Sequence, residues 1–382
     1  MANGTKYVDR EIPQISLADF DTRIDEITSQ LCNAAEHVGF FAVVDHDIAP
    51  ADVAAMFALS ERFFRLPDAV KATVPWNPGN VGWERESQVR PSTGAPDRKE
   101  SYQLQFGENM AGLWLGDEHL PGFRDRCLAF MHRLQRVSER LMICLARGLG
   151  FADDDYFVRY HDASKPTCQS VMRLLHYFET PQGLDGDNND SDKTNQVYHR
   201  AGAHADWGFL TLLFEKEGQS GLEICPGREV VTTEPHAALG EDAAAWSKVH
   251  FVPGSIVCNI GDLLMSWSDD RFKSTLHRVK APRGEPGDYY GERFSIAFFN
   301  QPCKDARIQG PRKKYPLVTG EEFNARAMSK HFAALQAKLR AKAEEGATET
   351  GAGGGSEDTM DSSNSSSNSS STAAAAQVPA AA

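Results

Sequence analysis

Residues 204–215 read HADWGFLTLLFE, and short runs of the same aromatic and aliphatic character recur on both sides, separated by turn residues. These runs are VMRLLHYF (171–178), GLEICP (221–226), KVHFVP (248–253), GSIVCNIGDLL (254–264), FKSTLHRVK (272–280) and RFSIAFFNQP (293–302). So many short strands between residues 171 and 302 are typical of an antiparallel sandwich or barrel rather than a parallel α/β sheet. The sequence therefore predicts a mainly β fold with a jelly-roll core.

Helical patterns flank this β region. Residues 21–39 and 49–67 carry apolar residues at helical spacing and end at Gly39 and Pro67. Residues 120–150 form a longer amphipathic pattern that ends in a glycine-rich turn, and a last helix is expected over roughly 321–345. We therefore expect α-helices around the jelly roll, with the short strand IPQISL before the first helix and the strand GFFAVVDH between the first two.

Composition divides the chain into three segments. Residues 1–120 are a mixed α/β segment, and residues 121–345 hold the long helix and the jelly roll. From 346 to 382 the chain is rich in Gly, Ser, Asn, Thr and Ala, so we expect a disordered, low-complexity tail. The polar stretch 183–196 (GLDGDNNDSDKTNQ) predicts a long surface loop.

Charge and cysteine content exclude several functions. The formal net charge is −13, which disfavours the basic face that nucleic-acid binding needs. The seven cysteines never form a CxxC pair, so neither a disulfide framework nor a thiolate zinc site is expected. No apolar run is long enough to span a membrane, and the N-terminus lacks the apolar core of a secretory signal. We expect a cytoplasmic protein with no nucleic-acid, membrane or obligatory protein partner.

The pair His204-Ala205-Asp206 is the first candidate for chemistry. Residues two apart in a strand point to the same side, so both side chains can converge inside a barrel. A histidine and a carboxylate at this spacing, joined by one distant histidine, are the donors of the facial triad of non-haem Fe(II) oxygenases. His277, in the alternating run KSTLHRV, is the candidate third ligand. We expect residues 254–270 to form a hairpin that returns His277 to the first pair.

Arg293-Phe294-Ser295 is the second candidate. Arg293 and Ser295 share one side of a strand, and an arginine fork beside a hydroxyl suits a carboxylate held in a dry pocket. Tyr177, on the strand before the acidic loop, could share that carboxylate, although a buried structural role is nearly as plausible. A surface ion pair is the alternative for Arg293, and it would contribute under about 1 kcal/mol.

In these residues the chain resembles the isopenicillin-N-synthase-like branch of the Fe(II)/2-oxoglutarate-dependent dioxygenases, from about residue 10 to about residue 335. The matching segments follow in family order: IPQISLADF, HVGFFAVVDHDI, FFRLPDAVK, DRKESYQLQFG, MRLLHYFETP, AHADWGFLTLLFE, SGLEI, VPGSIVCNIGDLLMSWSDDRFKSTLHRV and RFSIAFFNQP. Each segment is weakly specific, but their joint occurrence is not expected by chance. The resemblance implies a double-stranded β-helix and makes residues 121–345 the catalytic domain.

The resemblance also implies roles for individual residues. His204, Asp206 and His277 match the iron ligands, and Arg293 and Ser295 match the pair that binds the distal carboxylate of 2-oxoglutarate. Tyr177 matches an assisting tyrosine, although Leu175 stands where plant-type members have asparagine. By family position, the candidates for the substrate wall are Trp207, Phe209, Phe299 and Tyr102. The implied cofactors are Fe(II), 2-oxoglutarate and O₂, with ascorbate as a reductant.

The implied activity is oxidation of a small molecule by hydroxylation, desaturation or ring closure, with release of succinate and CO₂, as in secondary metabolism. Two alternatives stay open: an Fe(II) oxidase of the same fold that does not use 2-oxoglutarate, and a non-catalytic metal- or ligand-binding protein. We expect the variable loops over 75–100, 183–200 and 280–292 to determine which substrate binds. The sequence alone does not identify that substrate.

Overall fold

The computed structural model describes residues 6–87, 97–180, 199–229, 245–282 and 288–329. Within these ranges, eight strands form the larger sheet, in the spatial order β2-β3-β11-β8-β13-β6-β5-β4. Their bounds are β2 (Gln14–Ser16), β3 (Phe40–Val44), β4 (Gly82–Arg85), β5 (Lys99–Gln105), β6 (Val171–Tyr177), β8 (Leu210–Glu215), β11 (Ile256–Ile260) and β13 (Arg293–Asn300). All neighbours pair antiparallel except β2 with β3, so the sheet has the antiparallel character expected of a jelly roll.

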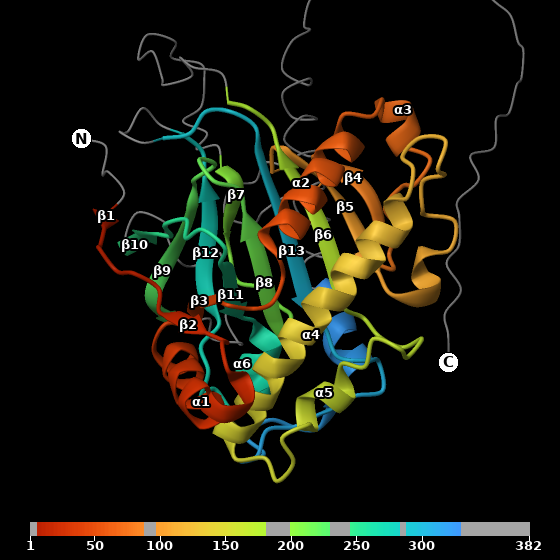
Figure 1. Ribbon diagram of the computed structural model, residues 1–382. Coiled ribbons are helices and arrows are strands. Elements are labelled where there is room, and N and C mark those ends of the chain that lie inside the picture. Colours follow the sequence, from red (N-terminus) through yellow and green to blue (C-terminus); the bar gives the residue numbers. More distant parts are fainter. Residues whose placement is uncertain (1–5, 88–96, 181–198, 230–244, 283–287, 330–382) are drawn as a thin grey trace, which may run out of the picture. The chain divides into compact units, whose positions relative to one another are not determined.

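A smaller sheet faces the inner side of the larger one (Figure 1). In the described residues its order is β1-β10-β9-β12-β7. The strands are β1 (Lys6–Tyr7), β7 (His199–His204), β9 (Leu222–Glu229), β10 (Ala245–Lys248) and β12 (Thr275–Lys280). A separate short pair joins β14 (Arg307–Ile308) to β15 (Val318–Thr319). The two facing sheets support the predicted double-stranded β-helix.

Helices cover the outer side of the larger sheet, where the long α4 crosses it and α2 lies nearby (Figure 1). The labelled helices of the described residues are α1 (Phe20–His37), α2 (Pro50–Phe64), α3 (Asp68–Lys71), α4 (Phe123–Leu149), α5 (Tyr156–Tyr160) and α6 (Asp262–Trp267), with the 3₁₀ turn η1 (Gly107–Met110). Residues 320–329 are also helical, at the start of the last helix that the sequence predicts. Gly39 follows α1 with φ +75°, and a Cβ there would lie 2.3 Å from the carbonyl oxygen of Lys273. The predicted helix end at Gly39 is therefore confirmed, since only glycine fits there.

Alternate residues of each strand in the larger sheet point to opposite sides. The residues of β13 that face the helices join the main hydrophobic core: Phe294, Ile296 and Phe298. Between them, Ala297 and Phe299 pack toward the smaller sheet with Ala201 and Val279. This alternation puts Arg293 and Ser295 on the inner side of the larger sheet.

The structure changes some sequence expectations, and others fall outside the described residues. Residues 254–270 do not form a hairpin: β11 belongs to the larger sheet, β12 to the smaller one, and α6 carries the chain between them. Strand β7 ends at His204, so Asp206 lies just beyond it. Described strands from both predicted segments, 1–120 and 121–345, pair in the larger sheet. The loop 183–196 and the tail 346–382 lie outside the described residues.

Candidate metal centre

His204, Asp206 and His277 converge at the end of β7 and on β12. One ligand atom from each residue lies within 4.8 Å of the others. The Nε2 atoms of His204 and His277 lie 3.8 Å and 3.7 Å from Oδ1 of Asp206. Among the described residues, this is the one group of His, Cys, Asp or Glu side chains arranged to hold a metal ion.

Strand pairing explains how residues so far apart in sequence meet. In the smaller sheet His277 pairs with His204, so the two rings lie side by side with their centroids 4.3 Å apart. Asp206 is fixed through its backbone, because its carbonyl oxygen accepts a hydrogen bond from the N–H of Asp262 at the start of α6. A Cβ at Gly261 would lie 3.0 Å from the same oxygen and 2.1 Å from the carbonyl oxygen of Gly208. Glycine at 261 therefore permits the close approach that holds Asp206.

Hydrogen bonds determine which ring nitrogen of each histidine is available to a metal ion. The Nδ1 atom of His204 lies 2.7 Å from the carbonyl oxygen of Gly202, and that of His277 lies 3.1 Å from the carbonyl oxygen of Thr275. A carbonyl oxygen only accepts, so each Nδ1 carries the hydrogen and donates it. Each Nε2 then holds its lone pair toward Asp206, which is the tautomer that metal binding requires.

The carboxylate of Asp206 is oriented in the same way. Its Oδ2 accepts hydrogen bonds from Oγ1 of Thr211 at 2.6 Å and Nδ2 of Asn259 at 2.8 Å, which leaves Oδ1 toward the histidines. Sequence reasoning missed both donors. Asn259 could have been found, because it is the polar residue in the buried apolar run IVCNI on β11. Thr211 gave no such signal.

The donor set suits a divalent iron ion. Two neutral imidazole nitrogens and one carboxylate oxygen are the ligands of non-haem Fe(II) sites, whose remaining positions are open to small ligands. Partners that orient the second atom of each ligand are typical of metal sites, and all three residues have them here. His277 and Asp206 are each 8% exposed, so this polar group lies within the fold rather than on its surface.

Arg293 and Ser295 lie together on β13, as their spacing predicted. The Nη1 atom of Arg293 donates to Oγ of Ser295 at 3.3 Å. Tyr177 lies opposite Arg293 on β6, with the guanidinium carbon 5.1 Å from its ring centroid. All three side chains are buried, which excludes the surface ion pair considered for Arg293. The structure therefore brings the three predicted co-substrate residues together.

Glu215 is a further member of this group that the sequence did not indicate. Nη2 of Arg293 donates to its Oε1 at 2.8 Å, and Nε of Arg293 donates to the carbonyl oxygen of Gln219 at 3.1 Å. Burial raises the pKa of the Glu215 carboxyl, while the charge of Arg293 acts in the opposite direction. A buried acid therefore offsets part of the positive charge that Arg293 offers to an anion.

The four candidates for the substrate wall lie in different places. Phe299 faces the inside of the barrel with Tyr177 and Leu175, and Trp207 is half-buried directly after Asp206. Tyr102 is fully buried on the outer side, where it stacks on Phe63 with ring centroids 4.5 Å apart. Phe209 is fully buried against Phe157 and Trp267. Tyr102 and Phe209 thus belong to the helix-facing core and do not face the inside of the barrel.

An inward polar group beside Phe299 went unnoticed in the sequence. The guanidinium carbon of Arg173 on β6 lies 5.1 Å from the ring centroid of Phe299. Its Nη2 donates to Oε1 of Gln103 at 2.8 Å, and Nε2 of Gln103 donates to Oε1 of Glu84 at 3.1 Å. This chain of hydrogen bonds crosses β6, β5 and β4 on the inner side of the sheet. It adds a second polar group to the inner side, next to Phe299.

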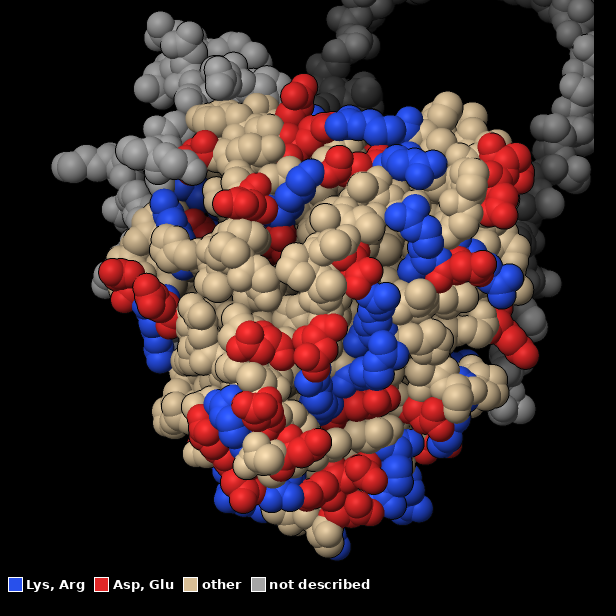
Figure 2. Space-filling model, in the orientation of Figure 1, with Lys and Arg blue, Asp and Glu red and all other residues tan. Residues whose placement is uncertain are grey.

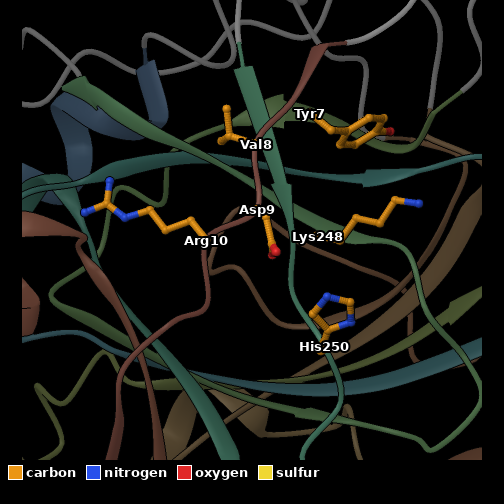
Figure 3. Close-up of a pocket in the computed structure, with 6 residues that line it drawn as sticks. All are labelled: Tyr7, Val8, Asp9, Arg10, Lys248 and His250. Atoms are coloured by element: carbon orange, nitrogen blue, oxygen red, sulfur yellow. The ribbon is translucent and has the colours of Figure 1, made fainter.

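The rest of the described surface offers less. Figure 2 shows acidic and basic side chains interspersed on the face it presents, without a continuous basic area. A pocket of about 410 Å³ lies at the edge of the smaller sheet, lined by Tyr7, Val8, Asp9, Arg10, Lys248 and His250 (Figure 3). None of the predicted site residues lines it. No helix among the described residues is long and apolar enough to cross a membrane.

Comparison with known proteins gives concordant matches. The 2OG-Fe(II) oxygenase superfamily matches residues 168–302, and the family described as non-haem dioxygenase in morphine synthesis N-terminal matches residues 12–115. The proline hydroxylase buaE of Petromyces alliaceus is 28% identical, with 78% of this chain and 90% of that protein covered. A UPF0676 protein of Schizosaccharomyces pombe is 30% identical, with 76% and 82% covered.

A solved structure agrees with the fold. A full-length Neurospora crassa protein in complex with alpha-KG is 26% identical, with a TM-score of 0.68 over 83% of this chain and 96% of that one. The first family match includes the triad, Arg293 and Ser295. The chain therefore belongs to the 2OG-Fe(II) oxygenase superfamily, as an oxidoreductase that uses Fe(II), 2-oxoglutarate and O₂ to oxidise a small molecule.

Proposed function

We propose that His204, Asp206 and His277 bind the iron of this enzyme, and that Arg293, Ser295 and Tyr177 bind its 2-oxoglutarate. The observation that carries this proposal is the convergence of the triad. One donor atom of each residue is directed to a common point, and the second polar atom of each is already hydrogen-bonded. Such preorganisation favours a ligand that binds three donors at once.

In the overall reaction, the substrate R–H, O₂ and 2-oxoglutarate give R–OH, succinate and CO₂, so that one oxygen atom enters each organic product. Bound iron supplies the redox chemistry that couples O₂ cleavage to loss of CO₂ from the keto acid. Arg293 and Ser295 hold the distal carboxylate by charge-assisted hydrogen bonds, so that the keto acid end lies toward the triad. Thr211 and Asn259 keep Asp206 oriented throughout, and the apolar inner wall around Leu175 excludes water.

We propose that the substrate is a small planar molecule with polar edges. Phe299 offers an aromatic face inside the barrel, and Arg173 with Gln103 offers hydrogen-bond donors and acceptors next to it. Aromatic faces bind flat rings by stacking, while the polar pair would read carbonyl, amide or carboxylate groups at the ring edge. The Neurospora crassa protein solved in complex with alpha-KG and thymine, 25% identical with a TM-score of 0.69, is consistent with such a ligand.

Succinate release tests the proposed reaction. Enzyme reconstituted with Fe(II), ascorbate and 2-oxoglutarate is assayed for succinate and O₂ uptake over a panel of nucleobases, phenolics, alkaloids and amino acids. We expect a planar heterocycle to stimulate both in equal amounts. Arg173→Met should abolish the stimulation while leaving substrate-independent succinate formation intact. Stimulation only by non-planar aliphatic compounds, or equal stimulation in Arg173→Met, contradicts the proposed substrate class.

The same assay separates the alternatives raised by the sequence. An oxidase that does not use 2-oxoglutarate would take up O₂ with a substrate and release no succinate. A non-catalytic binding protein would do neither, but membership of an oxygenase superfamily disfavours it. We further propose a role in secondary metabolism and a cytoplasmic location, without a nucleic-acid, membrane or obligatory protein partner.

A further inference from the structure

Arg200 on β7 is a buried arginine that neither the sequence motifs nor the family residues include. Its side chain is 2% exposed. Nη2 donates to the carbonyl oxygens of Tyr289 at 3.1 Å and Gly291 at 2.6 Å, in the segment that leads into β13. Its guanidinium carbon lies 5.4 Å from the ring centroid of Tyr289. Arg200 therefore connects the edge strand of the smaller sheet to the start of the strand that carries Arg293.

Two nitrogens of Arg200 lack a partner. Nε and Nη1 are both buried, and neither has a hydrogen-bond partner among the residues that the structure describes. No carboxylate in the described ranges pairs with this guanidinium. Burial lowers the pKa of Arg200 to about 10, and the neighbouring positive charge of Arg293 adds to that effect. A buried cation with unused donors is costly unless an anion binds there, so the site is incomplete as it stands.

The neighbours of Arg200 indicate which anion is missing. Arg200 directly precedes Ala201, which packs with Tyr177 in the inner cluster. The carbonyl groups that accept its hydrogen bonds lie two to four residues before Arg293. Glu215 already occupies Nη2 of Arg293 and carries a negative charge of its own when ionised. Arg293 alone would therefore present little net charge to a carboxylate. Arg200 supplies a second positive charge, and the sum of Arg200, Arg293, Glu215 and one bound carboxylate is neutral.

We propose that Arg200 and Arg293 together bind the distal carboxylate of 2-oxoglutarate. This inference rests on the proposed function, because it assigns a residue to the same co-substrate. Nη1 of Arg200, which has no partner in the described ranges, donates to the carboxylate, while Nη2 stays on the two backbone carbonyl oxygens. Arg200 also ties the segment before β13 to β7, which keeps Arg293 close to the triad.

Calorimetric titration of protein loaded with Mn(II), which replaces Fe(II) without turnover, tests the proposal. The two ligands are 2-oxoglutarate and 2-oxopentanoate, which has a methyl group where 2-oxoglutarate has its distal carboxylate. Arg200→Met should weaken 2-oxoglutarate binding about 10- to 100-fold, the effect of losing a charge-assisted hydrogen bond. Binding of 2-oxopentanoate should change little. Arg200→Lys, which keeps the charge, should lie between the wild type and Arg200→Met.

Two controls separate charge recognition from a structural effect. Arg65→Met removes an exposed arginine that pairs with Glu292 in the same segment, so it disturbs the loop without changing the pocket, and its affinity should be unchanged. Arg200→Met combined with Glu215→Gln should regain much of the lost affinity, because Arg293 is then no longer offset. A double variant that binds no better than Arg200→Met contradicts this charge balance.

The outcomes for Arg200 and for the proposed function are distinguishable. Equal affinity for 2-oxoglutarate in wild type and Arg200→Met, or equal losses for both keto acids, overturns the role of Arg200. Failure of wild-type, Mn(II)-loaded protein to bind 2-oxoglutarate at all instead overturns the proposed co-substrate site. Circular dichroism of every variant establishes that it is folded before the titration.

Discussion

The two sides of the larger sheet differ in how completely their buried polar residues are paired. On the outer side, Glu100 of β5 is 2% exposed and accepts hydrogen bonds from Nζ of Lys71 at 2.7 Å and Nε1 of Trp83 at 2.8 Å. His176 of β6 lies 2.8 Å from the same carboxylate through Nδ1 and 3.2 Å from Glu292 through Nε2. Every charge in this outer cluster has an opposite charge beside it, as a structural role requires.

The inner side uses neighbouring residues of the same strands differently. Tyr177 follows His176 on β6, and Arg293 follows Glu292 at the start of β13. At the smaller sheet, which faces this side, the donor atoms of the triad converge on a common point, and Nε and Nη1 of Arg200 have no hydrogen-bond partner in the described structure. Buried polar groups that the fold leaves incomplete are candidates for ligand binding, because burial without a partner is unfavourable. The comparison thus separates polar residues that stabilise the outer side of the larger sheet from those that lie on or across from its inner side.

Removing a triad residue should give the largest difference between the two sides. His277→Ala leaves two of the three proposed iron ligands. Loss of a residue that only orients a metal ligand lowers metal affinity or activity roughly 10- to 100-fold, and we expect turnover to fall by more than that. Iron content after anaerobic reconstitution and succinate formation are the measurements. His176→Ala, on the outer side, is the matched control and should retain its iron. Equal iron content in both variants would remove the distinction.

Arg293→Met should have the next largest effect. It deletes the guanidinium that faces the distal carboxylate, so we expect the KM for 2-oxoglutarate to rise about 10- to 100-fold. The iron content should not change, since Arg293 does not contact the triad. Initial rates of succinate formation across a 2-oxoglutarate series measure the effect. An unchanged KM would show that the co-substrate carboxylate binds elsewhere.

Asn259→Ala should lower the affinity for iron less than His277→Ala does. The variant removes one of the two hydrogen bonds to Oδ2 of Asp206 and leaves the one from Thr211. Loss of such an orienting partner costs up to about 10- to 100-fold in metal affinity, and we expect the lower end because one partner stays. Titration with Fe(II) under argon measures it. An effect as large as that of His277→Ala would make Asn259 a ligand rather than an orienting residue.

Glu100→Gln should have the smallest effect on turnover. It removes the buried carboxylate that pairs with Lys71 and leaves only the exposed Asp68 at 3.0 Å, so the free energy of unfolding should fall by up to about 3–5 kcal/mol. The affinities for Fe(II) and 2-oxoglutarate should stay within about twofold of wild type, because this cluster lies on the other side of the sheet. Urea unfolding and ligand titration measure the two quantities. A large loss of 2-oxoglutarate affinity would mean that the two sides are coupled through Glu292.

The sequence predicted the site where its residues follow strand alternation. Arg293 and Ser295 stand two apart within β13, so one period of the strand puts both on one side. Asp206 has the same spacing from His204 but lies beyond the end of β7, where its backbone hydrogen bond with Asp262 holds it. Tyr177 and Phe299 were predicted from family position, and both face inward in the structure. The jelly roll followed from the density of short strands, whereas the crossing through α6 did not, because DLLMSW is apolar enough to be read as a strand.

Other residues could not be predicted because their roles depend on long-range pairing. No short motif marks Arg200, Glu215 and Arg173 as site residues. They come near the site only because β7, β8, β13 and β6 lie together in the folded chain. Tyr102 and Phe209 were predicted to line the substrate site, but strand position alone does not show which side their side chains take. They lie in or next to strands that line the barrel, but their side chains point to the helices, and a one-residue shift in position changes the side on which a side chain lies.

The most direct test of the central claim is the anaerobic Fe(II) stoichiometry of wild type and of Asp206→Ala, measured at saturating 2-oxoglutarate. The inner-side triad predicts one tightly bound Fe(II) per wild-type chain and none in the variant, with the outer variant His176→Ala behaving as wild type. Asp206→Ala that retains one tightly bound Fe(II) would contradict the account, because the iron would then be held by residues other than His204, Asp206 and His277.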